Sequence, residues 1–179
     1  MIKTSPKFTA PTAAVIALVV LTGTACAASE TFLYKRAVNN ARRGNPDFAY
    51  MDYRLLLREH PNTRYREQVD LAMAEYMYQI PSFAEAKPMF ERYLSDHPET
   101  EAKLFILAYL YHIAQAKNDA PSLEKYRKEI IDCKQVSLVF RDRKEYMYTS
   151  PLGRQLKAVF SIDNIEFSVN GELLTKISY

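Results

Sequence analysis

Apolar positions along the chain recur in the same order twice, at a constant spacing. The first copy runs from Ala37 to Pro61 and the second from Ala74 to Pro98, a shift of 74 − 37 = 37 residues. Repetition at a period of about 20 to 50 residues is typical of architectures in which each unit packs on the next. We therefore expect stacked helical hairpins. The matched positions are Ala37, Ala49, Tyr53, Leu57, His60 and Pro61, which recur as Ala74, Ala86, Phe90, Leu94, His97 and Pro98.

Candidate helix starts follow the same period. A first helix is expected from Thr31 to Arg43, where apolar residues fall four apart. At the second start, Asn45 can cap free backbone N–H groups, and Pro46 lacks an N–H that would have no partner there. Ser82 begins a capping-box pattern at 82 − 45 = 37 residues after Asn45. The remaining starts are expected near Thr63, Thr100 and Ser122.

The third unit departs from the pattern in its second half. Its first helix, expected from Leu104 to Ala114, is strongly apolar, but the following helix from Leu123 to about Cys133 lacks a terminal His-Pro. Its cap, Ser122, lies 122 − 82 = 40 residues after Ser82 rather than 37. Terminal units of repeat arrays are commonly atypical, because no further unit packs on them. The array is therefore predicted to end here.

After Lys134 the apolar period changes from helical to alternating. Val136 to Phe140 is expected to be a strand, Arg141 to Lys144 a polar turn, and Tyr146 to Tyr148 the partner strand. The segment 151–160 fits either a strand or a short helix begun by Ser150-Pro151, and the pattern leaves both open. The predicted fold is mainly α, with a small C-terminal antiparallel β-meander that packs on the last helical unit.

The final hairpin surrounds Asn170-Gly171. A two-residue turn would pair Phe167 with Leu174 and divide the apolar residues between the two faces of the sheet. A three-residue loop that includes Val169, with a bulge at Gly171, would keep Phe167 opposite Leu173. The second arrangement gathers the apolar residues on one face, so we expect the three-residue loop.

The N-terminus has the organisation of an export signal. Basic residues at Lys3 and Lys7 precede an apolar run from Ala13 to Leu21, and small residues follow. Nine apolar residues are too few to span a bilayer, which needs about 20. We therefore divide the chain into an export signal (1–25), a helical repeat domain (26–134) and a small β subdomain (135–179).

The residues before Cys26 resemble the lipobox of bacterial lipoproteins. Small residues precede Cys26 as in that motif, although Gly23 stands where Leu, Val or Ile is usual. The resemblance implies lipidation of Cys26, and the absence of Asp after it resembles the outer-membrane sorting pattern. The alternative is ordinary signal cleavage after Ala27, which would discard the cysteine. The protein is expected to face the periplasm, anchored to the outer membrane if lipidated and otherwise soluble in the periplasm or secreted.

Composition indicates no catalytic or metal chemistry. Without the two signal lysines, the chain has 24 − 2 = 22 basic and 21 acidic residues, which gives no electrostatic argument for nucleic acid. The four glycines are scattered, so no phosphate-binding loop is present, and no Cys/His spacing suits a metal. Cys133 would be a lone thiol. We expect neither enzymatic activity nor a cofactor.

The repeat itself resembles a known family. Small alanines in the first helices, an Ala-x-x-x-aromatic pattern in the second helices, and a proline eight residues later resemble the tetratricopeptide repeat over about residues 31–133. That family has a period of 34, and the three extra residues here fall between Pro61 and Ala74. The resemblance implies a right-handed array of about three hairpins. Combined with a lipoprotein signal, it is similar to the repeat-built outer-membrane lipoproteins of bacteria.

In the repeat family, first helices line a concave groove that binds partners. Tyrosines two apart on a helix point to nearly opposite sides, so one of each pair can face outward. The resemblance implies a non-catalytic scaffold that binds a peptide or helix of an envelope protein. The alternative is a structural subunit of an envelope assembly that associates through its C-terminal sheet edge. The residues expected to face the groove are Glu75, Tyr78, Gln79, Tyr111 and His112.

Overall fold

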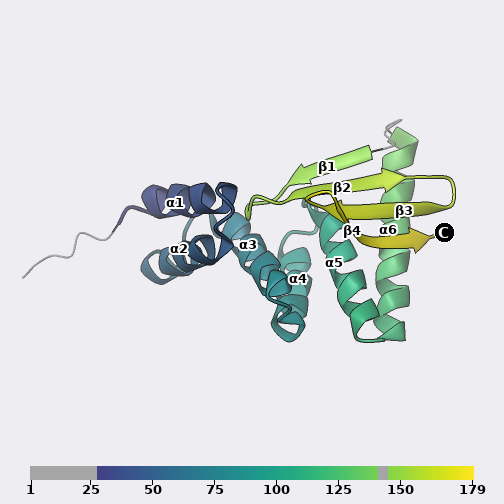
Figure 1. Cartoon of the computed structure of the whole chain (residues 1–179), viewed down its shortest axis with the longest axis horizontal. Helices are drawn as coiled ribbons and strands as arrows, with labels where there is room; N and C mark the ends of the chain where they lie inside the picture. Colours follow the sequence, from purple (N-terminus) through teal and green to yellow (C-terminus); the bar gives the residue numbers. More distant parts are fainter. Residues whose placement is uncertain (1–27, 141–144) are drawn as a thin grey trace, which may run out of the picture.

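The computed structural model describes residues 28–140 and 145–179, with the backbone alone for 134–140, and shows six helices followed by four strands (Figure 1). This confirms the predicted order of a mainly helical region and a C-terminal antiparallel sheet. The helices are α1 (Glu30–Arg42), α2 (Pro46–Glu59), α3 (Arg66–Gln79), α4 (Phe83–Asp96), α5 (Lys103–Ala116) and α6 (Ala120–Phe140). The strands are β1 (Glu145–Thr149), β2 (Gln155–Phe160), β3 (Asn164–Val169) and β4 (Glu172–Ser178).

Helix positions follow the 37-residue shift. The second helices of the two copies begin at Pro46 and Phe83 (83 − 46 = 37), and the helices after them begin at Arg66 and Lys103 (103 − 66 = 37). The most extensive helix contacts join α1 with α2, α3 with α4, and α5 with α6. Repeat-equivalent positions are buried alike, because the small alanines let neighbouring helices approach closely. Ala37, Ala49, Tyr53, Ala74, Ala86 and Phe90 are all 0 % exposed.

Three predicted helix starts are displaced. Thr100, like Thr63, lies three residues before the helix that follows it, and Ser122 lies within α6. Thr63 lies three residues before α3 begins, and its hydroxyl accepts a hydrogen bond from the Tyr65 backbone N–H at 3.2 Å. The same hydroxyl donates to the Glu30 carboxylate at 3.0 Å. Thr63 therefore stabilises the turn before α3 and ties it to α1, instead of capping the helix.

The predicted strand at Val136–Phe140 is wrong, because α6 continues through Phe140. By Gln135 the helix is already 16 residues long, and each further residue that it fixes adds one backbone hydrogen bond. A strand at 136–140 would instead need a second strand to pair with. The five-residue alternation was too short to outweigh this continuity. The predicted turn at 141–144 lies outside the described residues.

The four strands form an antiparallel meander in the order β1-β2-β3-β4. The open question at 151–160 is thereby answered, because 155–160 is strand β2 and the residues before it form a turn. One face of the sheet packs on α5. The Phe105 ring of α5 stacks on Tyr146 of β1 at 5.5 Å between centroids and meets Phe167 of β3 edge-on at 6.3 Å.

The β3–β4 turn differs from the prediction. Val169 pairs with Glu172, so the loop has two residues, and Asn170 and Gly171 both have positive φ (52° and 87°), as a type I′ turn requires. The bulge lies within the strands, between the Phe167–Thr175 pair and the Ser168–Leu173 pair. It places Phe167 opposite Thr175 on the buried face and leaves Leu173 exposed. The predicted pairing of Phe167 with Leu173 is therefore wrong. The bulge keeps Ile165, Phe167 and Ile177 on the buried face but leaves Leu173 on the opposite one.

Buried side chains form two cores. The main core joins α3, α4, α5 and α6 to the inner face of the sheet, and its largest fully buried rings are Tyr109, Tyr126, Phe90 and Phe167. The smaller first core is built from α1, α2 and α3, and one residue from the β1–β2 loop completes it. Its members are Leu33, Ala37, Ala41, Ala49, Tyr53, Leu56, Val69, Ala72 and Leu152.

Candidate functional site

A buried carboxylate lies on α3, between the helices and the sheet. Glu75 is 0 % exposed, and Tyr109 of α5 donates a hydrogen bond to its Oε1 at 3.4 Å. Its Oε2 has no hydrogen-bond partner of normal geometry among the described residues. Burial raises the pKa of Glu75 to about 7, because a carboxylate is poorly solvated there. The nearby Ser150 side chain, the Arg154 charge, the Tyr109 hydroxyl and the Leu152 backbone lower that pKa only in part.

The β1–β2 loop, residues 150–154, crosses the first helices. Leu152 is buried in the first core, and the Tyr53 hydroxyl of α2 donates to the Pro151 carbonyl at 2.9 Å. Gly153 has φ +79°, and a Cβ there would lie 3.1 Å from the Ala41 carbonyl oxygen, so a side chain does not fit without a shift. This loop joins the sheet to both α1 and α2.

The same loop covers part of the predicted groove. Glu75 was expected to face an open groove, but it is buried and therefore not available at the surface in this structure. Gln79, at the end of α3, is exposed, yet its Oε1 already accepts a hydrogen bond from the Arg154 guanidinium at 2.7 Å. The first helices thus contact a segment of their own chain at these two positions, because the sheet follows the array and folds back onto it.

Tyr78 and His112 come together beyond the loop. The Tyr78 hydroxyl and His112 Nδ1 are hydrogen-bonded at 2.7 Å, and Tyr109 and Phe83 pack on the Tyr78 ring with centroids 4.6 and 5.4 Å away. Burial raises the pKa of Tyr78 to about 12 and lowers that of His112. Both side chains are therefore uncharged near neutral pH, and both remain half-buried.

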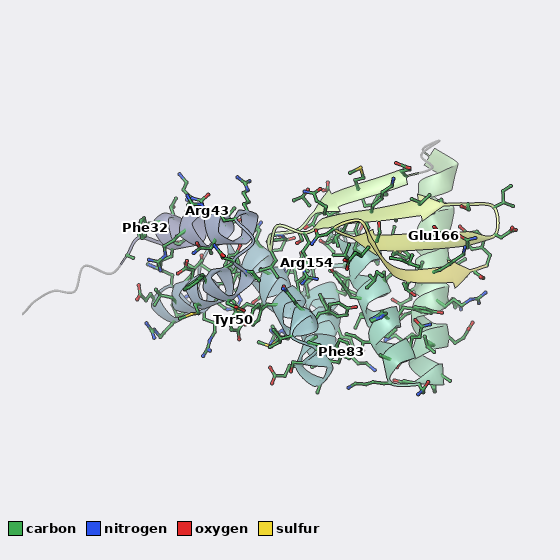
Figure 2. The ribbon with its side chains drawn as sticks, in the orientation of Figure 1. Phe32, Arg43, Tyr50, Phe83, Arg154 and Glu166 are labelled. Atoms are coloured by element: carbon green, nitrogen blue, oxygen red, sulfur yellow. The ribbon has the colours of Figure 1, made fainter. Side chains whose placement is uncertain are left out.

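Tyr111 follows the main core on α5 and is half-buried at its margin. We refer to the half-buried side chains of Tyr78, Phe83, Tyr111 and His112 as the aromatic edge. The Phe83 label in Figure 2 marks its position at the start of α4. Whether this edge binds a partner stays a prediction.

The residues that cover part of the predicted groove were not identified from the sequence. Tyr53 was identified as a repeat position, but its hydroxyl contact with Pro151 spans 98 residues of sequence. The sequence indicated only that Ser150-Pro151 could begin a short helix, and such a local signal does not say what the segment packs against. Tyr109, the partner of Glu75, was visible only as one of two neighbouring tyrosines.

The two cysteines differ in what can be said of them. Cys26 lies outside the described residues, so its lipidation stays a prediction. Cys133 on α6 is half-buried, and burial raises the pKa of its thiol.

Within residues 28–140 and 145–179 no group of three or more His, Cys, Asp or Glu side chains is arranged to hold a metal ion. None of the described helices combines the length and the apolar content needed to cross a bilayer.

Comparisons of the chain with protein-family models, with curated proteins and with solved structures found no match.

Proposed function

We propose that this protein is a non-catalytic interaction scaffold of the bacterial cell envelope, which binds a peptide or helix of an envelope protein. In this proposal the helix pairs form a right-handed tetratricopeptide-like array. The protein faces the periplasm and is anchored to the outer membrane through a lipid on Cys26. No cofactor takes part.

The observation that carries the proposal is the uncharged aromatic edge. Tyr78 and His112 satisfy each other with one hydrogen bond, and the pKa directions of both keep them neutral. Half-buried aromatic rings offer a large apolar area with polar rims, which suits the apolar side chains of a docked peptide or helix. Glu75 is buried and the exposed Gln79 is already hydrogen-bonded to Arg154, so the proposed contact is restricted to this edge.

Crosslinking in cells from the aromatic edge, followed by mass spectrometry, identifies the partner. The double variant Tyr78→Ala plus Tyr111→Ala is expected to lose that partner. Tyr78→Phe, which keeps the ring, is expected to retain it. The matched control is Met147→Ala plus Leu173→Ala on the outer face of the sheet, where both side chains are exposed (65 % and 67 %). Thermal unfolding of each variant shows whether the fold is kept, and unchanged recovery with the folded double variant would remove the edge from the proposal.

A second candidate function has its own supporting observation. Met147 of β1 and Leu173 of β4 lie in one cross-strand row on the outer sheet face, through the pairs Met147–Lys157, Lys157–Ser168 and Ser168–Leu173. Exposed apolar residues at both margins of a sheet suit a structural subunit that assembles through this sheet.

The variant Met147→Lys plus Leu173→Lys separates the two functions. If the sheet mediates assembly, light scattering will show smaller particles while partner recovery through the aromatic edge is retained. If the scaffold function alone holds, both the particle size and the recovery will match those of the unmodified protein.

A further inference from the structure

Charge is distributed unevenly along the chain. The segment 30–66, which spans α1, α2 and the turn before α3, holds eight basic and four acidic residues, a net charge of +4. The remainder, 67–179, holds 22 − 8 = 14 basic and 21 − 4 = 17 acidic residues, a net charge of −3. The near-neutral total therefore conceals a basic N-terminal end. Its basic residues are Lys35, Arg36, Arg42, Arg43, Arg54, Arg58, Arg64 and Arg66.

Two basic residues of α1 and its C-cap Arg43 share a face with an exposed aromatic ring. Phe32, Lys35, Arg36 and Arg43 follow the spacing i, i+3, i+4 and i+11, which places them on one side of the helix. Phe32 is 55 % exposed, and the Arg36 guanidinium lies over its ring at 5.5 Å from the centroid. Lys35 and Arg43 are exposed and form no ion pair with any residue in the described part of the chain.

Helix α2 adds an apolar stripe beside this face. Phe48 and Met51 are 61 % and 63 % exposed, and Leu55 continues the stripe one turn later. Arg36 Nε donates to Asp52 Oδ1 of α2 at 2.9 Å. Since Asp52 lies one turn after Phe48, this contact brings the two stripes together. We call the combined surface the basic apolar face, formed by Phe32, Lys35, Arg36, Arg43, Phe48, Met51 and Leu55.

The basic apolar face lies where the chain enters the described structure. Figures 1 and 2 show α1 and α2 at the end of the molecule opposite α6, with Phe32 at the outer end of α1. Cys26 precedes the first residue of α1 by 30 − 26 = 4 positions, and a chain of four residues spans at most about 14 Å. An anchor at or before Cys26 would hold this face close to a bilayer surface.

We propose that the basic apolar face docks on an anionic phospholipid surface, with the cations of α1 at the headgroups and Phe32, Phe48 and Met51 at the acyl boundary. Exposed aromatic and aliphatic residues beside Lys and Arg have the chemistry of peripheral membrane-binding helices. A second copy in a symmetric dimer would oppose two faces of the same sign, which repel. Docking would point α6 and the far end of the sheet away from the membrane. The inference does not depend on partner binding at the aromatic edge.

The chain has no tryptophan, so a single introduced indole reports its own surroundings. The full-length variant Phe48→Trp is compared with Ile162→Trp, which replaces a 94 % exposed apolar residue between β2 and β3. On phosphatidylglycerol vesicles, emission from Phe48→Trp is expected to shift to shorter wavelength and to be quenched by brominated acyl chains. Emission from Ile162→Trp is expected to stay that of indole in water.

Charge reversal tests the electrostatic part in the Phe48→Trp background. Lys35→Glu plus Arg43→Glu is expected to weaken partitioning on anionic vesicles by about thirtyfold or more, since each cation lost reduces binding by about fivefold. The control Lys117→Glu plus Lys128→Glu changes the net charge equally at other exposed positions and is expected to have a small effect.

The proposal would be overturned if the two tryptophan variants behave alike. It would also be overturned if quenching is equal on zwitterionic vesicles and survives the reversal at Lys35 and Arg43, because then the N-terminal segment alone binds the membrane. If emission from Phe48→Trp stays that of indole in water on every vesicle, the proposal is also overturned, and a protein partner becomes the alternative occupant of this face.

Discussion

The first helix pair, α1 with α2, and the second pair, α3 with α4, carry the same repeat in different surroundings. Tyr53 and Phe90 occupy equivalent positions (90 − 53 = 37), and both are 0 % exposed. Phe90 stacks on Tyr109 of α5 at 5.2 Å, within the main core. The Tyr53 hydroxyl instead donates a hydrogen bond to the Pro151 carbonyl of the β1–β2 loop. The repeat determines which positions are buried, whereas the neighbours in the array determine what those positions contact.

The two pairs also differ in how their interiors are completed. The second pair lies between the first pair and α5, so helices supply its packing from both sides. The first pair has α3 on one side only, and Leu152 of the loop completes its core. We infer that the stability of the first pair depends on a contact made nearly 100 residues later in the chain.

The largest expected effect is in the second pair. Phe90→Ala removes a fully buried ring and its stack on Tyr109, and should lower the free energy of unfolding by about 3 to 5 kcal/mol. Urea denaturation followed by circular dichroism measures this. Phe48→Ala makes the same change at a 61 % exposed ring and should alter the stability by less than about 0.5 kcal/mol. Similar losses in the two variants would contradict the assignment of Phe90 to the core.

The next effect lies at the junction of the two pairs and depends on pH. In the fold burial raises the pKa of Glu75 to about 7, from an ordinary value of 4.5. The raised pKa means that folding disfavours the charged form, so the penalty is absent below pH 4.5, grows as the pH rises, and is complete above about pH 7. Glu75→Gln removes this penalty. It should therefore stabilise the protein at pH 8 by up to about 3 kcal/mol and leave it nearly unchanged at pH 4.

Thermal unfolding between pH 4 and pH 8 checks this prediction. Glu99→Gln is the matched control, because Glu99 is exposed and loses no buried contact. A stabilisation by Glu75→Gln that is equal at both pH values would show that the carboxylate charge is not the cause.

Sequence reasoning located the helices better than the sheet contacts, for a physical reason. Helix positions follow from local periodicity, and the shift of 37 residues supplied that information a second time. Asn45 and Ser82 do precede helices as predicted, but their side chains make no capping hydrogen bond. The strand predicted at Val136–Phe140 rested on five residues, and the continuation of α6 overrode it. At the last hairpin, a bulge was expected because a regular two-residue turn would divide the apolar residues between the two faces of the sheet. The type I′ turn at Asn170-Gly171 then moved the bulge into the strands.

The candidate site was predicted only in part, because long-range contacts decided the rest. Tyr78 and His112 were expected on one surface, and the structure joins them by a hydrogen bond. Glu75 was expected on that surface too, but the β1–β2 loop buries it. No local pattern in residues 150–154 indicates that they cross the first helices, since the contact depends on how the sheet packs on α5.

The smallest expected effect separates the two pairs most directly. Tyr53→Phe keeps the buried ring but removes the hydrogen bond to Pro151, so it should lower the stability by about 1 kcal/mol. Because the lost contact anchors the loop, backbone amides in residues 152–154 should exchange hydrogen faster. Tyr126→Phe loses a comparable hydrogen bond to Glu91 at 2.6 Å, remote from the loop, and should lower the stability without faster exchange there. Equal exchange at the loop in both variants would mean that Leu152 packing alone holds it, and that the hydroxyl of Tyr53 does not distinguish the first pair from the second.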